Sequence, residues 1–201
     1  MNRRYFPNST GCINHGVTEH FGVEMIDVDM VMASLENAVA STGGFCCGRS
    51  FVVGHQRLSG LGYCFSASLP PLLSTAASEA LHIMDEEPER FVRLRANSKA
   101  VHAGLKKAFE GTAFYVKGNE LSPMQLVHYN GEREVAESKL DALVDEMFSH
   151  DILLTRARYL DNDEAFPVLP AVRVMASSEL AEDELIHTLA MLEKTAHSLC
   201  A

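Results

Sequence analysis

Histidine and cysteine, the residues that most often carry chemistry, are present without the spacing of a familiar site. The chain has nine histidines, and none of them forms the His-Glu-x-x-His pattern with which one helix holds zinc. Cys46 and Cys47 are adjacent, too close for the usual pair of zinc ligands. The sequence therefore predicts no metal site, scattered histidines and reduced, mostly buried thiols. The five cysteines are Cys12, Cys46, Cys47, Cys64 and Cys200.

Lysine, the residue that forms Schiff bases, is confined to the second half of the chain. All six lysines lie at or beyond Lys99. Neither a Gly-x-Ser-x-Gly nucleophile elbow nor a Walker phosphate loop occurs. Residues 1–98 therefore contain no lysine side chain that could form a Schiff base. The lysines are Lys99, Lys106, Lys107, Lys117, Lys139 and Lys194.

A run of small hydroxyl residues, Phe65-Ser66-Ala67-Ser68-Leu69-Pro70-Pro71, precedes a helical pattern. Proline is favoured at the first helical position, and a serine just before it is a common N-terminal cap, for which Ser68 is the candidate. A helix start can also bind an anion with the same groups. The residues alone leave both interpretations open.

Composition excludes several classes of function. The 201 residues are 47% hydrophobic and 22% charged, which is typical of a soluble globular protein. The formal net charge of -10 opposes binding to a phosphate backbone, so we expect no nucleic-acid partner. The uncharged stretch 58–78 is interrupted by glycines and prolines, which predicts no membrane span, and the first residues encode neither a signal peptide nor an anchor.

The elements that must position these residues change in character near residue 70. Before residue 70, short apolar runs among glycines predict strands. After it, long amphipathic patterns alternate with short apolar segments, which predicts an α+β layer with helices on one face of a sheet. The helices are broken at Glu87-Pro88, where proline prevents continuation. Predicted strands are 30–34, 45–47, 63–65, 113–116, 125–129, 152–159 and 171–176; predicted helices are 72–84, 91–109, one through Leu140 and Met147, and one through Leu185 and Leu199.

Three blocks in fixed order give the chain a family resemblance. They are Gly16-Val17-Thr18-Glu19-His20, the segment 35–48 ending in Gly43-Gly44-Phe45-Cys46-Cys47-Gly48, and the Phe65–Pro71 run. Over residues 16–201 the chain resembles the α-oxoamine synthases, pyridoxal-phosphate (PLP) enzymes of aminotransferase fold type I. Within them it is most similar to the serine palmitoyltransferase branch and its long-chain-base subunits of type 1.

The resemblance implies a role for Asn37. Catalytic members of the family hold PLP on a lysine eight residues before the aromatic residue of the Gly-Gly-aromatic turn, and eight residues before Phe45 lies Asn37. An amide can neither form a Schiff base nor act as a general base, so this chain alone is expected to be inactive and without covalently bound PLP. A turn residue with no further role is equally compatible with Asn37.

Two further residues gain roles by resemblance, each beside a simpler alternative. Ser66 matches the hydroxyl residue that reaches across the dimer to the PLP phosphate held by the partner subunit, while a loop that only caps the following helix is the alternative. Arg173 lies in a predicted strand where catalytic relatives bind the carboxylate of the amino acid, while a salt bridge at a strand end is the alternative.

The expected fold class is α/β, the C-terminal portion of a PLP-dependent transferase of fold type I. Its expected divisions are an unmatched segment 1–15, the C-terminal part of the large cofactor domain over 16–71, and a complete α+β small domain with its linking helix over 72–201. The family's N-terminal region, with its membrane anchor and cofactor-stacking residue, has no counterpart here. Whether that reflects natural truncation or an incomplete gene stays open.

The expected function is that of a non-catalytic subunit, or a C-terminal part of one, of serine C-palmitoyltransferase. Such a complex condenses serine with palmitoyl-CoA to 3-ketodihydrosphingosine, with the lysine and PLP supplied by a homologous catalytic partner in a heterodimer. By resemblance the complex belongs at the cytosolic face of the endoplasmic reticulum membrane, although this chain is itself expected to be soluble. The alternative is a non-enzymatic remnant of the PLP fold that binds or regulates another protein.

Overall fold

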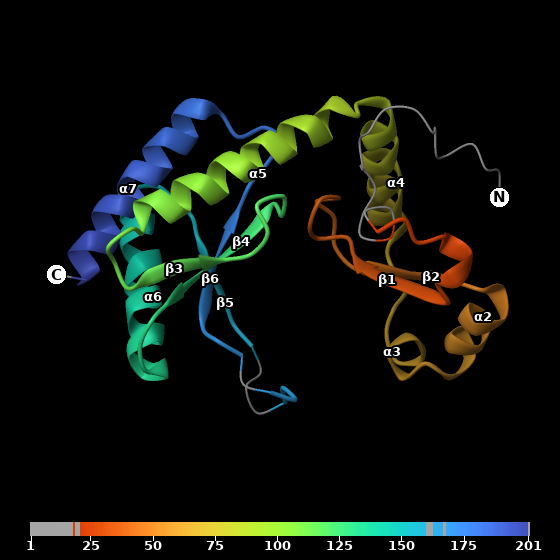
Figure 1. Cartoon of the computed structure of the whole chain (residues 1–201). Coiled ribbons are helices and arrows are strands. Elements are labelled where there is room, and N and C mark those ends of the chain that lie inside the picture. Colours follow the sequence, from red (N-terminus) through yellow and green to blue (C-terminus); the bar gives the residue numbers. More distant parts are fainter. Residues whose placement is uncertain (1–17, 19–20, 160–162, 167, 201) are drawn as a thin grey trace. The chain divides into compact units, whose positions relative to one another are not determined.

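The computed structural model describes residue 18 and residues 21–159, 163–166 and 168–200 (Figure 1). The segment 1–15, Cys12 and most of the Gly16–His20 block lie outside these residues. The chain divides into two compact units, Met1–Pro88 and Glu89–Ala201. The helix after Pro70 falls in the first unit by this division, whereas the sequence grouped it with the small domain; the domain boundary at residue 71 stays a prediction.

From residue 21 to Pro88 the first unit contains a β-hairpin, a 3-10 helix and three α-helices. A 3-10 helix, η2 (Met25–Asp27), precedes β1 (Met30–Ser34), which pairs antiparallel with β2 (Gly44–Gly48). The helices are α2 (Ser50–Ser59), α3 (Leu61–Cys64) and α4 (Pro71–Glu86). Among the described residues β1 and β2 form a sheet of only two strands, so each has one edge without a strand partner.

The prediction of a strand at 63–65 is wrong. These residues follow Gly60 in a short helix, in which the Cys64 N–H donates to the carbonyl of Gly60 and the Phe65 N–H to that of Leu61. A three-residue apolar run carries no periodicity that separates strand from helix. The helix α2 was not anticipated, because the glycines around it, including Gly54 within it, indicated turns.

The second unit is an α+β layer, as the alternating patterns predict. Its elements are α5 (Glu89–Ala108), β3 (Phe114–Lys117), β4 (Met124–Tyr129), α6 (Arg133–Ser149), β5 (Thr155–Ala157), β6 (Ala171–Met175) and α7 (Glu182–Cys200). The strands form one antiparallel sheet in the order β3-β4-β6-β5. The strand predicted over 152–159 is shorter in the structure, where β5 covers only Thr155–Ala157.

Strand alternation divides the residues of this sheet between two faces. Phe114, Val127, Val172 and Val174 are buried in one core cluster with the inward faces of α5, α6 and α7. Residues of opposite parity, among them Tyr115, Met124 and Met175, remain between a third and a half exposed. The helices thus cover one face (Figure 1). The other face, called the open face below, is partly exposed at Arg173 but buried at His128.

Candidate functional site

Asn37 lies in the turn that joins β1 to β2. The Leu35 N–H donates to the carbonyl of Gly43 at 3.0 Å, and the Ser41 N–H donates to that of Leu35 at 2.8 Å. Ala38 has φ 74° and Ala40 has φ 52°, left-handed values that the tight path of the turn imposes. The Asn37 side chain is exposed at this turn, and its amide is neither nucleophile nor base at neutral pH.

The loop that carries Ser66 lies against this turn. A Cβ atom on Gly43, which has φ +96°, would approach the Leu69 side chain within 2.6 Å, so glycine both permits the backbone angle and makes room for the leucine. The Ser41 hydroxyl donates to the carbonyl of Leu73 in the first turn of α4, at 3.2 Å. The structure thus brings the Asn37 turn and the Ser66 loop together within the first unit.

Ser66 itself presents an exposed hydroxyl. No hydrogen bond joins its side chain to another residue in the described part of the chain. A phosphate oxygen could accept a hydrogen bond from this hydroxyl without breaking an existing one. Its role towards a cofactor phosphate stays a prediction.

The expectation that Ser68 caps the following helix is wrong. The residue that precedes α4 is Pro70, and no side chain caps the helix there. Proline at the first helical position has no N–H to satisfy, and Ser68 lies two residues too early to reach the next donors. Its hydroxyl instead hydrogen-bonds the phenolic oxygen of Tyr63. This bond, and a second from Arg57, lower the pKa of the exposed Tyr63.

Arg173 lies in the second unit, so the structure describes it separately from Asn37 and Ser66. In the sheet, Lys117 pairs with Leu126, Leu126 with Arg173, and Arg173 with Thr155. These four residues therefore form one row across the open face. In the described part of the chain no acidic side chain pairs with Arg173. The salt bridge considered as its alternative role thus has no partner there, and the guanidinium is available to an anion.

Arg156 fixes the strand beside Arg173. Its side chain, one-tenth exposed, donates to Asp141 of α6 at 2.7 Å and to the carbonyl of Ala171 at 3.1 Å. A buried arginine with both charge and hydrogen bonds satisfied holds β5, β6 and α6 in one arrangement. Arg156 is therefore structural, and Arg173 is the arginine on the open face.

The sequence reasoning missed His128, which lies on the same face in β4. Its Nδ1 donates to the carbonyl of Pro170 at 2.8 Å, and its ring stacks on Tyr115 with centroids 5.3 Å apart. Nε2 is buried and has no hydrogen-bond partner among the described residues. Burial is the main cause that lowers the pKa of His128, so the imidazole is neutral at neutral pH. Alternation along 125–129 could have revealed that His128 and Val127 face opposite ways.

The candidate site in the first unit has no side-chain amine for covalent attachment of PLP. The turn and loop that meet in the first unit include no lysine, since the first lysine of the chain is Lys99. Ser66 offers one hydrogen-bond donor to a phosphate group. Clusters of three or more metal-binding side chains are also absent from the described residues.

Comparison with protein families places the chain. Residues 9–182 match the family model described as aminotransferase class I and II. The match covers most of the chain, so the protein belongs to this family. The PLP-dependent fold expected from the sequence is thereby confirmed.

Two curated relatives show where within the family the similarity lies. The chain is 34% identical to serine palmitoyltransferase 1 of Dictyostelium discoideum, over 92% of this chain and 40% of that protein. It is 31% identical to long chain base biosynthesis protein 1 of Arabidopsis thaliana, over 96% of this chain and 40% of that protein. The resemblance to type 1 subunits is confirmed, and the chain spans about two fifths of the length of these relatives.

A solved structure supports the fold. A single-site variant of the serine palmitoyltransferase from S. paucimobilis, with a bound PLP-myriocin aldimine, superposes with a TM-score of 0.75. It is 22% identical, and the alignment covers 94% of this chain and 44% of that one. The arrangement of helices and strands is therefore that of part of this PLP-dependent fold.

None of the described helices has both the length and the apolar character of a membrane-spanning segment.

Proposed function

We propose that the chain is the C-terminal part of the non-catalytic subunit of serine C-palmitoyltransferase, the complex that condenses serine with palmitoyl-CoA. The observation that carries the proposal is its similarity, along nearly its whole length, to type 1 subunits of this enzyme. Similarity of this extent indicates a shared fold, but the function has to be inferred from the residues of the site.

The site supports a non-catalytic role. Asn37 stands at the position that the family's PLP lysine occupies, and no lysine precedes Lys99. The chain therefore contributes no Schiff-base nitrogen and no base at that position. The lysine and PLP come from a homologous catalytic partner, with the complex at the cytosolic face of the endoplasmic reticulum membrane.

What this chain contributes is a wall of a shared site. Ser66, exposed in a loop held against the Asn37 turn, donates to the phosphate of the partner's PLP. Arg173, on the open face and without an acidic partner among the described residues, binds a carboxylate by its planar fork. The Arg173 role is the weaker of the two, because a subunit without the lysine has no reaction of its own for that carboxylate.

Reconstitution of the condensation tests this function. The chain is expressed alone and with a lysine-bearing homologous subunit, both as it stands and extended by the unmatched part of the Dictyostelium relative. Formation of the 3-keto product from labelled serine is then measured.

We expect product only when both subunits are present, and none from either form of this chain alone. Product from this chain alone would make it a catalyst and refute the proposal. Stable binding to the partner without any change in activity would favour the alternative, a non-enzymatic protein-binding remnant.

A further inference from the structure

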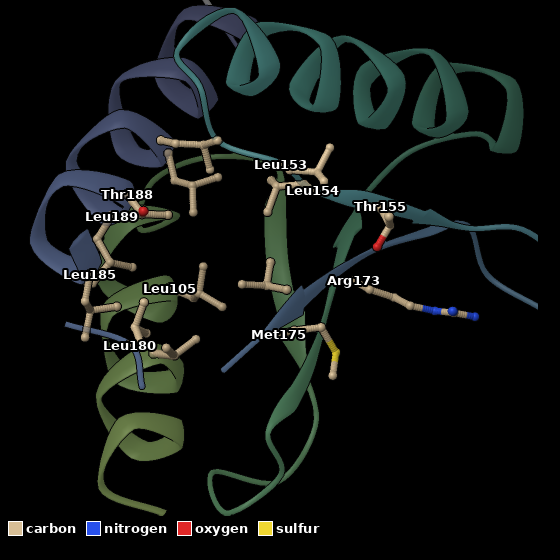
Figure 2. A pocket seen from close by; sticks show the side chains of 14 residues that line it. Leu105, Leu153, Leu154, Thr155, Arg173, Met175, Leu180, Leu185, Thr188 and Leu189 are labelled. Atoms are coloured by element: carbon tan, nitrogen blue, oxygen red, sulfur yellow. The ribbon is translucent and has the colours of Figure 1, made fainter. Parts of the chain in front are cut away.

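The second unit contains an apolar pocket between its helices and the end of its central strand (Figure 2). Its volume is about 190 Å³. Residues of α5, α7, β6 and the segment before β5 line it, and most of them are aliphatic. They include Leu105, Leu153, Leu154, Leu185, Leu189 and Leu192.

The pocket lies beside the end of β6, where β5 provides no pairing partner. β5 begins at Thr155, opposite Arg173, so β6 continues for two more residues, to Met175, without a partner on that side. At the other wall α5 and α7 approach closely, since a Cβ atom on Gly104 would lie 2.2 Å from the Leu189 side chain. α5 and α7 are therefore already in close contact with each other beside the space next to β6.

Leu153 is the most exposed hydrophobic residue of the lining, with 77% of the residue's surface accessible. Charge is kept out of the pocket: Arg173 contributes to the wall, but its guanidinium extends away from the leucines (Figure 2). Thr188 of α7 points in beside Leu189 and has no hydrogen bond to the described residues. A cavity whose interior is mostly aliphatic attracts apolar chains.

We propose that this pocket binds the end of a straight aliphatic chain of an amphiphile, with the polar head left in water beside Leu153. A cavity of roughly 150 Å³ with a similar lining stays dry and binds benzene, a six-carbon ligand. The present cavity therefore takes about six carbons, and a longer chain leaves its remainder outside. The site belongs to the second unit alone, and it stands or falls independently of the condensation reaction.

Chain length gives the first test. The full chain is titrated with 1-butanol, 1-hexanol, 1-octanol and 1-decanol, and the methyl resonances of Leu185 and Leu189 are followed by NMR. Affinity is expected to rise about fourfold per methylene until the cavity is full near six carbons, and to level off beyond. An affinity that keeps rising through decanol, or resonances that do not saturate, would overturn the proposal.

A matched pair of variants gives the second test. Thr188→Phe places a ring in the pocket and is expected to weaken hexanol binding at least tenfold. Ile186→Phe adds the same ring two residues away on the same helix, at a side chain that is 61% exposed, and should leave binding unchanged. Equal effects of the two substitutions would show adsorption to the surface and refute the pocket, and the chain-length series decides the matter if Thr188→Phe does not fold.

Discussion

The two units differ in how much apolar surface each buries by itself. Among the described residues of the first unit only Leu35 and Ala77 are buried hydrophobic residues. The second unit buries a continuous cluster that includes Leu105, Leu140 and Leu192, all without measurable exposure. Stability follows buried apolar area, so the second unit has a core of its own and the first does not.

The first unit instead exposes the kind of residue that a core normally contains. Among its described residues, the large hydrophobic ones that are more than two-thirds exposed are Phe21, Ile26, Met32, Phe51, Leu58, Leu61, Phe65 and Leu72. Apolar surface of this extent marks a region that another polypeptide covers. We infer that the first unit is the incomplete part of a larger cofactor domain, and that the second is a complete small domain.

Limited proteolysis of the full chain gives the largest contrast. We expect cleavage within residues 21–71, where few buried contacts oppose local opening, while a fragment from α5 to α7 persists. Mass spectrometry of the time course identifies the cut sites. Equal resistance along the chain would contradict the idea that only one unit is complete.

Truncation of core leucines measures the same difference as free energy. Leu140→Ala, in the second unit, should lower the free energy of unfolding by about 2 to 5 kcal/mol, because it leaves a cavity in a packed core. Leu72→Ala, at a side chain that is 78% exposed in the first unit, should change it by less than about 0.5 kcal/mol. Denaturant titration followed by circular dichroism compares them, and similar losses would break the comparison.

Substitution of the loop serines asks whether the first unit reaches a cofactor. In the complex with a lysine-bearing partner, Ser66→Ala removes a hydrogen bond to a charged phosphate and should lower PLP affinity by about 10- to 100-fold. Ser68→Ala is the matched control. It should leave PLP affinity unchanged and raise the pKa of Tyr63 towards its ordinary value, because it removes the bond that lowers that pKa most.

PLP titration of the two complexes separates these roles. Unchanged affinity after Ser66→Ala would remove that residue from the site and leave the loop a structural element.

A smaller effect is expected from pH on the second unit. Burial lowers the pKa of His128 below its unfolded value of 6.5, so the unfolded chain binds the proton more readily. The stability from this residue is complete above about pH 6.5 and falls as the pH drops below it. His128→Gln should flatten the slope of unfolding free energy between pH 7 and 5.5, and an unchanged slope would show that His128 does not control it.

The elements were predictable where pattern and burial agree. The hydrophobic run 30–34 coincides with β1, and the break at Glu87-Pro88 separates α4 from α5 as the proline requires. α2 and α3 were not predicted. Short apolar runs and glycine-rich segments carry no hydrophobic period that distinguishes a helix from a strand or a turn.

The site was predictable in part. Asn37 and Ser66 were singled out by resemblance, but the contact between the turn and the loop that carry them depends on Leu69 packing over Gly43 and on the Ser41 hydrogen bond. Neither contact has a local sequence signal. His128 escaped notice for the same reason, since its importance comes from a carbonyl 42 residues away.

Borohydride trapping in the assembled complex tests the central claim most directly. Reduction fixes any PLP aldimine as a pyridoxyl-lysine, and peptide mapping then identifies the subunit that carries it. The account predicts the label on one lysine of the catalytic partner and none on this chain. A pyridoxyl group on any lysine of this chain, from Lys99 to Lys194, would contradict it.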